Sequence, residues 1–306
     1  MEVISPRALR LALGPLTYYW PRERTLAFYD EALAWPVDIV YLGETVCSRR
    51  HELRLADWLE IAQRFHDAGK QAVLSTFELI ETDPDLRVMR SVAENGRFAV
   101  EANDMGAVSV LAGRVPFVAG PYLNVYNSGT RDLLAETGAT RWVAPVELSA
   151  AGIAAVGASA TRPLETEVFA WGRLPLAISA RCFTARFHNL AKDRCEYRCI
   201  EDPEGLALDT QDGEAFLTLN GVQTQSARVQ NLLPWLADAR GAGVDVLRLS
   251  PQPEGMSKVV ATFAAAVAGR MPIGEACERL AETTRAASCD GYWHGRAGME
   301  HLAHSP

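Results

Sequence analysis

The feature that most constrains the fold is a regular alternation of short β-prone runs with longer amphipathic stretches along a chain of 306 residues. The short runs predict strands, and apolar residues recurring at three- and four-residue steps predict helices. The predicted strands span 9–13, 38–43, 71–77, 97–102, 116–120, 141–146, 166–171 and 245–250. The predicted helices span 22–34, 55–69, 83–96, 105–113, 128–138, 149–159, 230–243 and 257–270.

This alternation predicts a particular α/β architecture. Strands separated by helices pair in parallel, because parallel neighbours need a crossover connection. Eight such units of about thirty residues each predict a closed (β/α)8 TIM-like barrel. An open doubly wound sheet is the alternative. No GxGxxG motif opens a helix after the first strand and no GxxxxGK[ST] motif occurs, so the sequence indicates neither a dinucleotide site nor a P-loop.

The alternation is interrupted once, after the seventh predicted strand. Residues 172–229 contain a cysteine-rich segment, followed at 206–225 by Asp-Gly and Asn-Gly pairs that are typical of hairpin turns. We therefore expect a barrel over residues 1–270, interrupted by a small cysteine-bearing module at 172–229. Residues 271–306 follow the last unit and are predicted to form a C-terminal cap.

The net charge and the lengths of the apolar runs limit which binding partners and which cellular compartment we expect for this chain. A net charge of −8 and a sequence pI near 5.4 disfavour a nucleic-acid partner, which a basic surface would attract. No run approaches the roughly 18 apolar residues that span a bilayer. Residues 1–15 lack the basic start, apolar core and cleavage site of a signal peptide. We therefore expect a cytoplasmic protein without a transmembrane segment.

Three of the six cysteines lie within residues 181–199, RCFTARFHNLAKDRCEYRC. Basic residues surround Cys182, Cys195 and Cys199, and neighbouring positive charge favours the thiolate, which is the form that binds metals. The expected compartment disfavours a disulfide. Buried apolar thiols are another interpretation, but residues 192–198, KDRCEYR, are too polar for a core segment. A metal or cluster site is therefore favoured.

A fourth ligand is expected outside this segment. Cys277 lies in a predicted helix and Cys289 near the tail, and both are interpreted as structural. Cys47 follows the second strand, and the loops after barrel strands gather on the face from which the module also departs. The candidate metal ligands are Cys47, Cys182, Cys195 and Cys199. Four thiolates suit zinc or an iron–sulfur cluster, and their dispersed spacing is unlike the paired knuckles of structural zinc sites, which favours a cluster.

Further polar residues lie at or just beyond predicted strand ends, where the catalytic side chains of barrels project. They are Glu44, Glu78, Glu101, Glu147, Asn124 and Asn127. Each carboxylate is a candidate general acid or base if it is desolvated, but carboxylates at such positions are also often plain loop caps. The asparagines are candidates for orienting a carbonyl or hydroxyl group. The sequence assigns no catalytic residue.

Residues 167–195, EVFAWGRLPLAISARCFTARFHNLAKDRC, resemble the collagenase-like peptidase superfamily, and most closely its UbiV-like members. The shared signature is LP-LA-S-ARCFTAR followed by Cys-x12-Cys-x3-Cys, with an early cysteine after the second strand. The stretches GPLTYYWPR (14–22) and GYWHGRAGME (291–300) are also similar to that group. The resemblance therefore covers nearly the whole chain.

The resemblance implies a function that spacing alone does not show. UbiV-like proteins hold a [4Fe–4S] cluster on four cysteines and form a heterodimer with UbiU, a paralogous chain. The pair hydroxylates ubiquinone precursors without dioxygen, and prephenate is implied as the oxygen donor. The cluster ligands implied here are Cys47, Cys182, Cys195 and Cys199. The alternative is a metal-stabilised, non-catalytic scaffold that activates a paralogous partner.

The chain departs from its superfamily at one position. Many members carry His-Gly after the EVF strand, where this chain has Trp171–Gly172. If that histidine takes part in the chemistry, the partner subunit must supply it. No GxSxG or HExxH motif occurs and the six histidines form no recognisable set, so an active peptidase is not expected.

Overall fold

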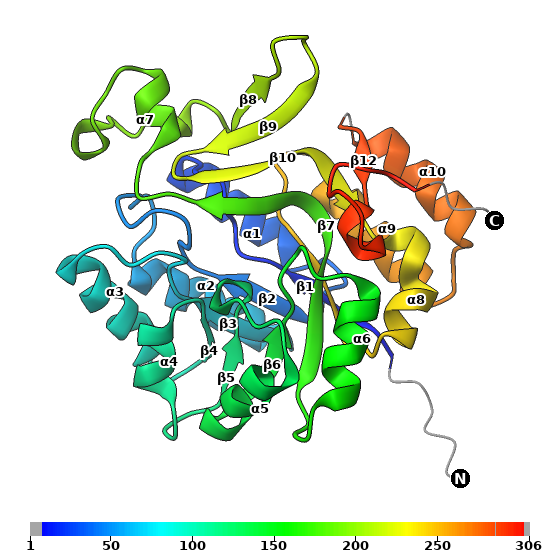
Figure 1. Ribbon diagram of the computed structural model, residues 1–306. Helices are drawn as coiled ribbons and strands as arrows, with labels where there is room; N and C mark the ends of the chain where they lie inside the picture. Colours follow the sequence, from blue (N-terminus) through cyan, green and yellow to red (C-terminus); the bar gives the residue numbers. More distant parts are fainter. Residues whose placement is uncertain (1–7, 285, 303–306) are drawn as a thin grey trace.

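The computed structural model describes residues 8–284 and 286–302, and its fold is shown in Figure 1. Eight parallel strands close into a barrel in the order β1–β2–β3–β4–β5–β6–β7–β11, and β11 pairs again with β1. These strands are β1 Arg10–Leu13, β2 Ile39–Leu42, β3 Gln71–Ser75, β4 Ala99–Ala102, β5 Phe117–Ala119, β6 Ala139–Val143, β7 Glu165–Ile178 and β11 Val246–Leu249. The predicted (β/α)8 TIM-like barrel is confirmed. The open doubly wound sheet is wrong, because β11 closes the circle.

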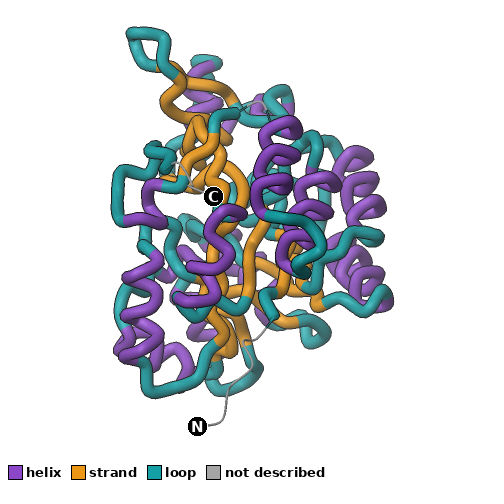
Figure 2. Tube along the Cα trace, turned by 90° about the vertical axis from the view of Figure 1, so that its right-hand side faces the viewer, coloured by secondary structure: helices purple, strands orange, loops and turns teal. Residues whose placement is uncertain are grey.

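Helices surround the strands (Figures 1 and 2). They are α1 Arg22–Ala32, α2 Leu55–Asp67, α3 Asp83–Ala93, α4 Met105–Leu111, α5 Ser128–Thr137, α6 Ala150–Ser159, α8 Leu236–Gly241 and α9 Met256–Val267. Side-chain caps begin several of them: Thr82 accepts a hydrogen bond from the backbone of Asp85 in α3, and Ser149 accepts one from Gly152 in α6. Within the described residues, no helix combines the length and apolar character needed to cross a membrane.

Alternate residues of the barrel strands face two separate cores. In β1, Leu11 and Leu13 belong to the large core that includes the helices, whereas Ala12 belongs to a smaller cluster within the barrel. The smaller cluster consists of Ala12, Ile39, Tyr41, Val73, Val118, Val143 and Val246. A strand buried on both faces requires this period of two.

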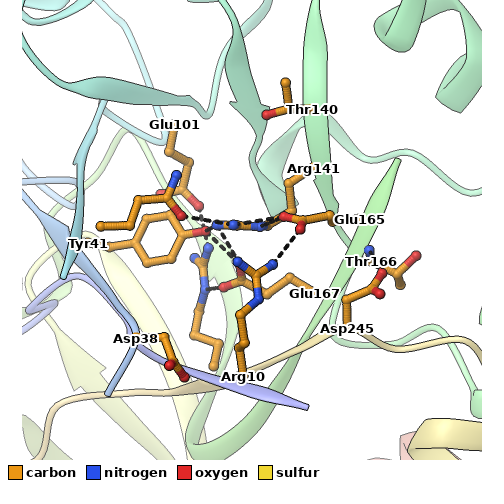
Figure 3. Close-up of polar contacts among 12 residues, drawn as sticks. Arg10, Asp38, Tyr41, Glu101, Thr140, Arg141, Glu165, Thr166, Glu167 and Asp245 are labelled. Atoms are coloured by element: carbon orange, nitrogen blue, oxygen red, sulfur yellow. Dashed lines mark hydrogen bonds and ion pairs between the residues drawn. The ribbon is translucent and has the colours of Figure 1, made fainter. Parts of the chain in front are cut away.

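Charged side chains also occupy the barrel interior (Figure 3). Arg248 on β11 donates to Glu101 at 2.7 Å and to Glu167 at 2.6 Å. Arg141 on β6 donates to the Tyr41 hydroxyl at 2.9 Å, and Tyr41 donates to Glu167 at 2.5 Å. Both carboxylates are fully buried. Buried charges are retained only when they are paired and hydrogen-bonded, so this network acts as a unit.

One strand, β7, continues beyond the barrel into the cysteine-bearing module, residues 172–229. Its outer half pairs antiparallel with β10, which pairs with β9, and β9 pairs with β8. The bounds are β8 Leu206–Asp209, β9 Ala215–Asn220 and β10 Gln223–Asn231. Gly213 and Gly221, from the Asp-Gly and Asn-Gly pairs, lie at the predicted turns with positive φ. No secondary-structure boundary occurs at residue 172.

The cysteine segment of the module contains only short helical elements. They are α7 Phe183–Phe187 and the 3₁₀ turns η2 Lys192–Arg194 and η3 Arg198–Ile200. Figure 1 shows α7, β8 and β9 together at the top of the view, beyond one end of the barrel, and Figure 2 shows the same projection from the side.

The helix predicted over 230–243 is shorter than expected. Gln230 and Asn231 still belong to β10, and a 3₁₀ turn, η4 Leu233–Trp235, precedes α8. Pro234 lies in that turn, and proline lacks the amide N–H that the interior of an α-helix needs. The α-helix therefore begins only after this turn.

The C-terminal region packs against the barrel and the module. Its elements are α10 Ile273–Thr283, β12 Ser288–Cys289 and the 3₁₀ turn η5 Gly291–His294. α10 packs on α9, and β12 pairs with β10. Asp290 is buried and accepts hydrogen bonds from the Trp235 indole at 3.0 Å and the Leu302 backbone at 2.8 Å. Of the predicted cap, residues 271–306, residue 285 and residues 303–306 lie outside the described residues.

Candidate metal centre

Four cysteines line one small cavity between the barrel and the module, which we call the cysteine cavity. Cys47 lies on the loop between β2 and α2, and Cys182 immediately precedes α7. Cys195 follows η2, and Cys199 lies within η3. The other lining residues are Arg49, Arg50, Thr184, Ala185, Lys192, Tyr197, Arg198 and Gly221. The structure therefore brings together the four cysteines singled out from the sequence.

The remaining two cysteines do not line this cavity. Cys277 is partly buried on α10, and Cys289 is fully buried in β12. Both occupy packing positions.

Two residues shape the loop that carries Cys47. Gly43 has a φ of 126°, and a Cβ there would lie 2.9 Å from the carbonyl oxygen of Ser75, so this close approach requires glycine. Glu44 accepts hydrogen bonds from the backbone N–H groups of Val46 and Cys47, at 3.0 and 3.1 Å. These bonds fix the backbone conformation at the first cysteine.

The segment carrying the other three cysteines is irregular and locally strained. The Cys182 sulfur accepts a hydrogen bond from the Ala185 backbone at 3.4 Å and so caps α7. Glu196 and Tyr197, between the last two cysteines of the cavity, have φ values of 52° and 56°. Non-glycine residues adopt this left-handed conformation rarely, and it is retained where surrounding structure or function requires it.

Contacts across the cavity hold the module against the loop. Arg49 donates from Nη2 to the carbonyl oxygen of Asp193 at 2.7 Å. The His51 ring lies edge-on to Tyr197, with 4.7 Å between ring centroids. The loop after β2 and the cysteine segment are therefore in direct contact.

Arg50 is the buried cation of the cysteine cavity. Its side chain is 2% exposed and lies 3.5 Å from Glu44. Nη1 donates to the carbonyl oxygen of Thr17 and Nη2 donates to Oδ1 of Asn220, each at 2.7 Å. The guanidinium also lies over the Tyr19 ring, 5.4 Å from its centroid. Arg50 therefore ties the barrel, the loop and the module together at one buried point.

Burial dominates the protonation of the cavity thiols. It raises the pKa of Cys47, Cys182 and Cys199 above that of an ordinary thiol, while the positive charge of Arg50 lowers each pKa to a smaller extent. The ionising effect expected from the basic neighbours is thus present and is outweighed by loss of water.

Three buried arginine nitrogens at the cavity lack hydrogen-bond partners within the described part of the chain, namely Nε of Arg49, Nε of Arg50 and Nε of Arg198. A buried N–H without an acceptor is unfavourable, so a guest rich in negatively charged sulfur fits these residues. Among residues 8–284 and 286–302, no three His, Cys, Asp or Glu side chains stand close enough together to share a single metal ion. The residues of the cysteine cavity therefore fit a sulfur-rich guest through their thiols, their unpartnered N–H groups and the enclosed space, and the single-ion geometry contributes nothing to this fit.

A second small cavity lies at the carboxyl ends of the barrel strands, and we call it the barrel-mouth cavity. Its polar lining includes Thr17, Glu78, Glu101, Asn103, Tyr122 and Arg248. Glu78 accepts hydrogen bonds from the Thr45 hydroxyl at 3.0 Å and from the Gln223 amide at 3.2 Å. Burial nevertheless raises the pKa of Glu78 to about 8, so this carboxyl is largely protonated at neutral pH.

Buried amides of the module connect the two cavities. Asn220 accepts from Arg50 at 2.7 Å and donates to Oε1 of Gln223 at 3.3 Å. Gln223 in turn donates to Glu78, and Gln225 donates to Gln223 at 2.7 Å. A continuous polar path therefore runs from the cysteine cavity to the barrel-mouth cavity.

Sequence reasoning missed this path. Gln223 and Gln225 belong to a stretch interpreted only as hairpin strands, yet both are buried. Their spacing of two was the available signal, because alternate residues of a strand share one face.

The other polar residues predicted at strand ends lie in structural positions. Glu101 belongs to the ion network of the barrel interior and also lines the barrel-mouth cavity. Glu147 accepts a hydrogen bond from a surface tyrosine, and Asn127 caps α5. Asn124 ends a 3₁₀ turn, η1 Pro121–Leu123, with a φ of 55°. The remaining two carboxylates are Glu44, which contacts Arg50 and the Cys47 backbone beside the cysteine cavity, and Glu78, which lines the barrel-mouth cavity.

Several solved structures are similar to this chain. The structure of the U32 peptidase Mk0906 matches with 13% identity and a TM-score of 0.41, over 82% of this chain and 96% of that chain. A tryptophan synthase from M. tuberculosis matches with 15% identity and a TM-score of 0.42, over 90% and 93%. A dihydropteroate synthase from Thermus thermophilus matches with 12% identity and a TM-score of 0.40, over 85% and 95%. At these identities the likeness concerns the fold alone.

The comparison with protein families gives a match that covers most of the chain. Residues 24–300 match Peptidase family U32, a range that includes most of the barrel and the whole module. This chain belongs to peptidase family U32.

Proposed function

We propose that this chain is the iron–sulfur subunit of a dioxygen-independent hydroxylase acting in ubiquinone biosynthesis, as a UbiV-like member of its family. The observation that carries the proposal is the cysteine cavity. Cys47 and the three cysteines of residues 181–199 come from two distant segments of the sequence and line one small cavity. Membership of peptidase family U32 supplies the wider class within which this proposal falls.

The cofactor in this proposal is a [4Fe–4S] cluster held by Cys47, Cys182, Cys195 and Cys199. When bound, such a cluster supplies one-electron transfer. The buried Arg50 offsets part of the negative charge that four thiolates bring into a site with little water. The unpartnered Nε–H groups of Arg49 and Arg50 are available as hydrogen-bond donors to sulfur.

The proposed partner is a UbiU-like paralogous subunit, in a cytoplasmic heterodimer. The small-molecule substrates of the pair are then a ubiquinone precursor and prephenate. Trp171, where many superfamily members have histidine, is 2% exposed and packs on Phe263, with 6.1 Å between ring centroids. This position therefore belongs to the apolar core, which supports a division of labour in which the partner supplies that histidine.

The test is iron and acid-labile sulfide per chain after anaerobic purification. We expect about four of each in the wild type and their loss in Cys195→Ala. Cys277→Ala is the matched control, because Cys277 does not line the cavity. Zinc in place of iron, or equal iron in the two variants, would contradict the cluster assignment.

A second candidate function is a metal-stabilised, non-catalytic scaffold that activates a paralogous partner. The observation that favours it is the irregular backbone over 188–205, where η2 and η3 are the elements described. A bound metal group would order such a segment whatever its redox activity. Cys195→Ala in the co-expressed pair separates the two functions. Loss of hydroxylation in a pair that still co-elutes supports the redox role, and retained hydroxylation supports the scaffold.

A further inference from the structure

A cleft of about 360 Å³ lies between α2 and α3, and we call it the α2–α3 cleft. Leu42 and Leu74, from the ends of β2 and β3, are among its lining residues. α2 packs on β3 and α3 packs on α4, and both helices are seen at the left of Figure 1. A cavity of this size falls within the range of small-molecule sites, roughly 300–1,000 Å³.

The walls of the cleft are largely apolar. The principal side chains are Leu53, Trp58, Phe77, Val88, Met89 and Val92. Trp58 and Met89 are buried, whereas Val88 on α3 is 46% exposed and stands where the cleft meets solvent. An apolar guest would therefore gain by leaving water.

Three of the four hydroxyl groups that line the cleft are already hydrogen-bonded within the protein. Ser75 donates to the Glu101 carboxylate at 2.7 Å, and Thr76 donates to the Glu101 carbonyl oxygen at 3.2 Å. Ser91 donates to the carbonyl oxygen of Arg87 at 3.0 Å. These three hydroxyls offer no donor to a guest, so polar recognition falls to the loop between β2 and α2, which contributes Glu44, Ser48, Arg50, His51 and Arg54. Glu44 is paired with the buried Arg50 at 3.5 Å.

That loop provides a positive charge with no ion-pair partner. Arg54 and His51 line the cleft and are exposed. Within residues 8–284 and 286–302, the Arg54 guanidinium forms no ion pair. The nearby carboxylates form their ion pairs or hydrogen bonds with other groups: Glu52 accepts from the Arg22 backbone at 2.9 Å, and Asp57 accepts from the Arg22 guanidinium at 2.6 Å and from the Arg54 backbone N–H at 2.7 Å. The charge of Arg54 is available to a ligand.

We propose that the α2–α3 cleft binds a small amphipathic anion, with an apolar ring system or short chain against Trp58 and Met89 and one acidic group at Arg54. The combination of apolar walls and a single unpaired cation selects this class over a sugar, a nucleotide or a neutral polar molecule. Arg50 lines both this cleft and the cysteine cavity, so the bound molecule would lie beside the residue that faces the thiols. The proposal rests on the cleft and holds whether or not the cavity binds a cluster.

Two fluorescent probes that differ by one charge test the proposal. 1-Anilinonaphthalene-8-sulfonate carries an apolar ring system and one sulfonate, and N-phenyl-1-naphthylamine is the same ring system without it. Titrated into the folded wild type, the anionic probe should bind with the higher affinity. Arg54→Gln should weaken the anionic probe about twofold to fivefold, as expected for one exposed ion pair, and leave the affinity of the neutral probe unchanged.

A substitution that fills the cleft tests whether the probes bind there. Val88→Trp places a large side chain in the opening and should weaken both probes at least tenfold. The matched control is Val115→Trp, since Val115 is 45% exposed and does not line the cleft. Equal binding by the two tryptophan variants, equal loss of both probes in Arg54→Gln, or binding that appears only above the thermal unfolding midpoint would overturn the proposal. So would a dimer that Val88→Trp dissociates, because the occupant would then be a second copy of the chain.

Discussion

Gln223 on β10 donates a hydrogen bond to Glu78 of the barrel at 3.2 Å, although 145 positions separate them in sequence. This bond joins the module to the barrel mouth at a carboxyl that the Thr45 hydroxyl also contacts. The module therefore helps to enclose Glu78, and the enclosure has a measurable consequence for the dependence of stability on pH.

Stability should fall as pH rises through the range in which only the unfolded chain has lost the proton of Glu78. Burial raises the pKa of Glu78 to about 8 from an ordinary value near 4.5. The contribution is complete below about pH 4.5, declines by at most about 1.4 kcal/mol per pH unit, and is lost above about pH 8. Urea unfolding between pH 5 and pH 9 should show this slope in the wild type and a weaker one in Glu78→Gln. The control is Glu147→Gln, and identical slopes in all three proteins would refute the assignment.

Removing the central cation of the barrel should be severely destabilising. Arg248→Met removes the ion-pair partner of the buried Glu101 and leaves Glu167 with Arg141 at 3.5 Å, and an unpaired buried charge costs about 3–5 kcal/mol. Arg162→Met is the matched control, since Arg162 pairs with Glu136 where both side chains are 52% exposed. We expect that change to cost less than about 1 kcal/mol. Denaturant unfolding measures both, and similar losses would mean that the interior network contributes no more than a surface pair.

Two glycine-to-alanine substitutions should change the stability of the protein in opposite directions. Gly172 has a φ of 128°, and a Cβ there would lie 2.6 Å from Cβ of Ser250. Gly172→Ala should therefore destabilise the protein by about 1–3 kcal/mol. Gly157 lies in α6 with no atom within 4 Å of an added Cβ. Gly157→Ala should stabilise the protein by up to about 1 kcal/mol. Thermal unfolding tests the pair, and a neutral Gly172→Ala would show that β7 can shift at this point.

Removal of a bound cluster should loosen the module before the barrel. Residues 188–205 carry short 3₁₀ turns, whereas the barrel strands are paired on both sides. Anaerobic chelation should therefore raise amide hydrogen exchange in that segment while β2 and β3 keep their protection. Chelator-treated Cys195→Ala serves as the control and should show no further change. Uniform exchange across the chain would instead indicate that the metal supports the whole fold.

Much of the fold could be predicted because the barrel elements are local and strongly periodic. The predicted strand at 38–43 and helix at 55–69, for example, correspond to β2 and α2 with shifts of at most two residues. The helix predicted from residue 230 was wrong in its first part, because strand pairing with β7 extends β10 to Asn231. Tertiary pairing of this kind overrides a local pattern.

The candidate site was predictable only in part. Thiols are rare and their spacing is legible, so Cys47 and its three partners could be singled out. Arg50 could be noted as a basic neighbour, but its role depends on Thr17 and Asn220, which approach it only in the folded chain. The spacing of two places Gln223 and Gln225 on one face of a strand, but it does not say whether that face is buried.

The uninterrupted course of β7 has a consequence for how this protein can move. The first half of β7 pairs within the barrel, and its second half pairs with β10 in the module, with no linker between the two halves. Hinged domains swing about short flexible joints, and the described structure offers none here. The module and the barrel are therefore expected to move together. If a docking subunit twisted the outer sheet of the module, β7 would transmit that twist directly to the barrel strands, because no flexible linker separates the two.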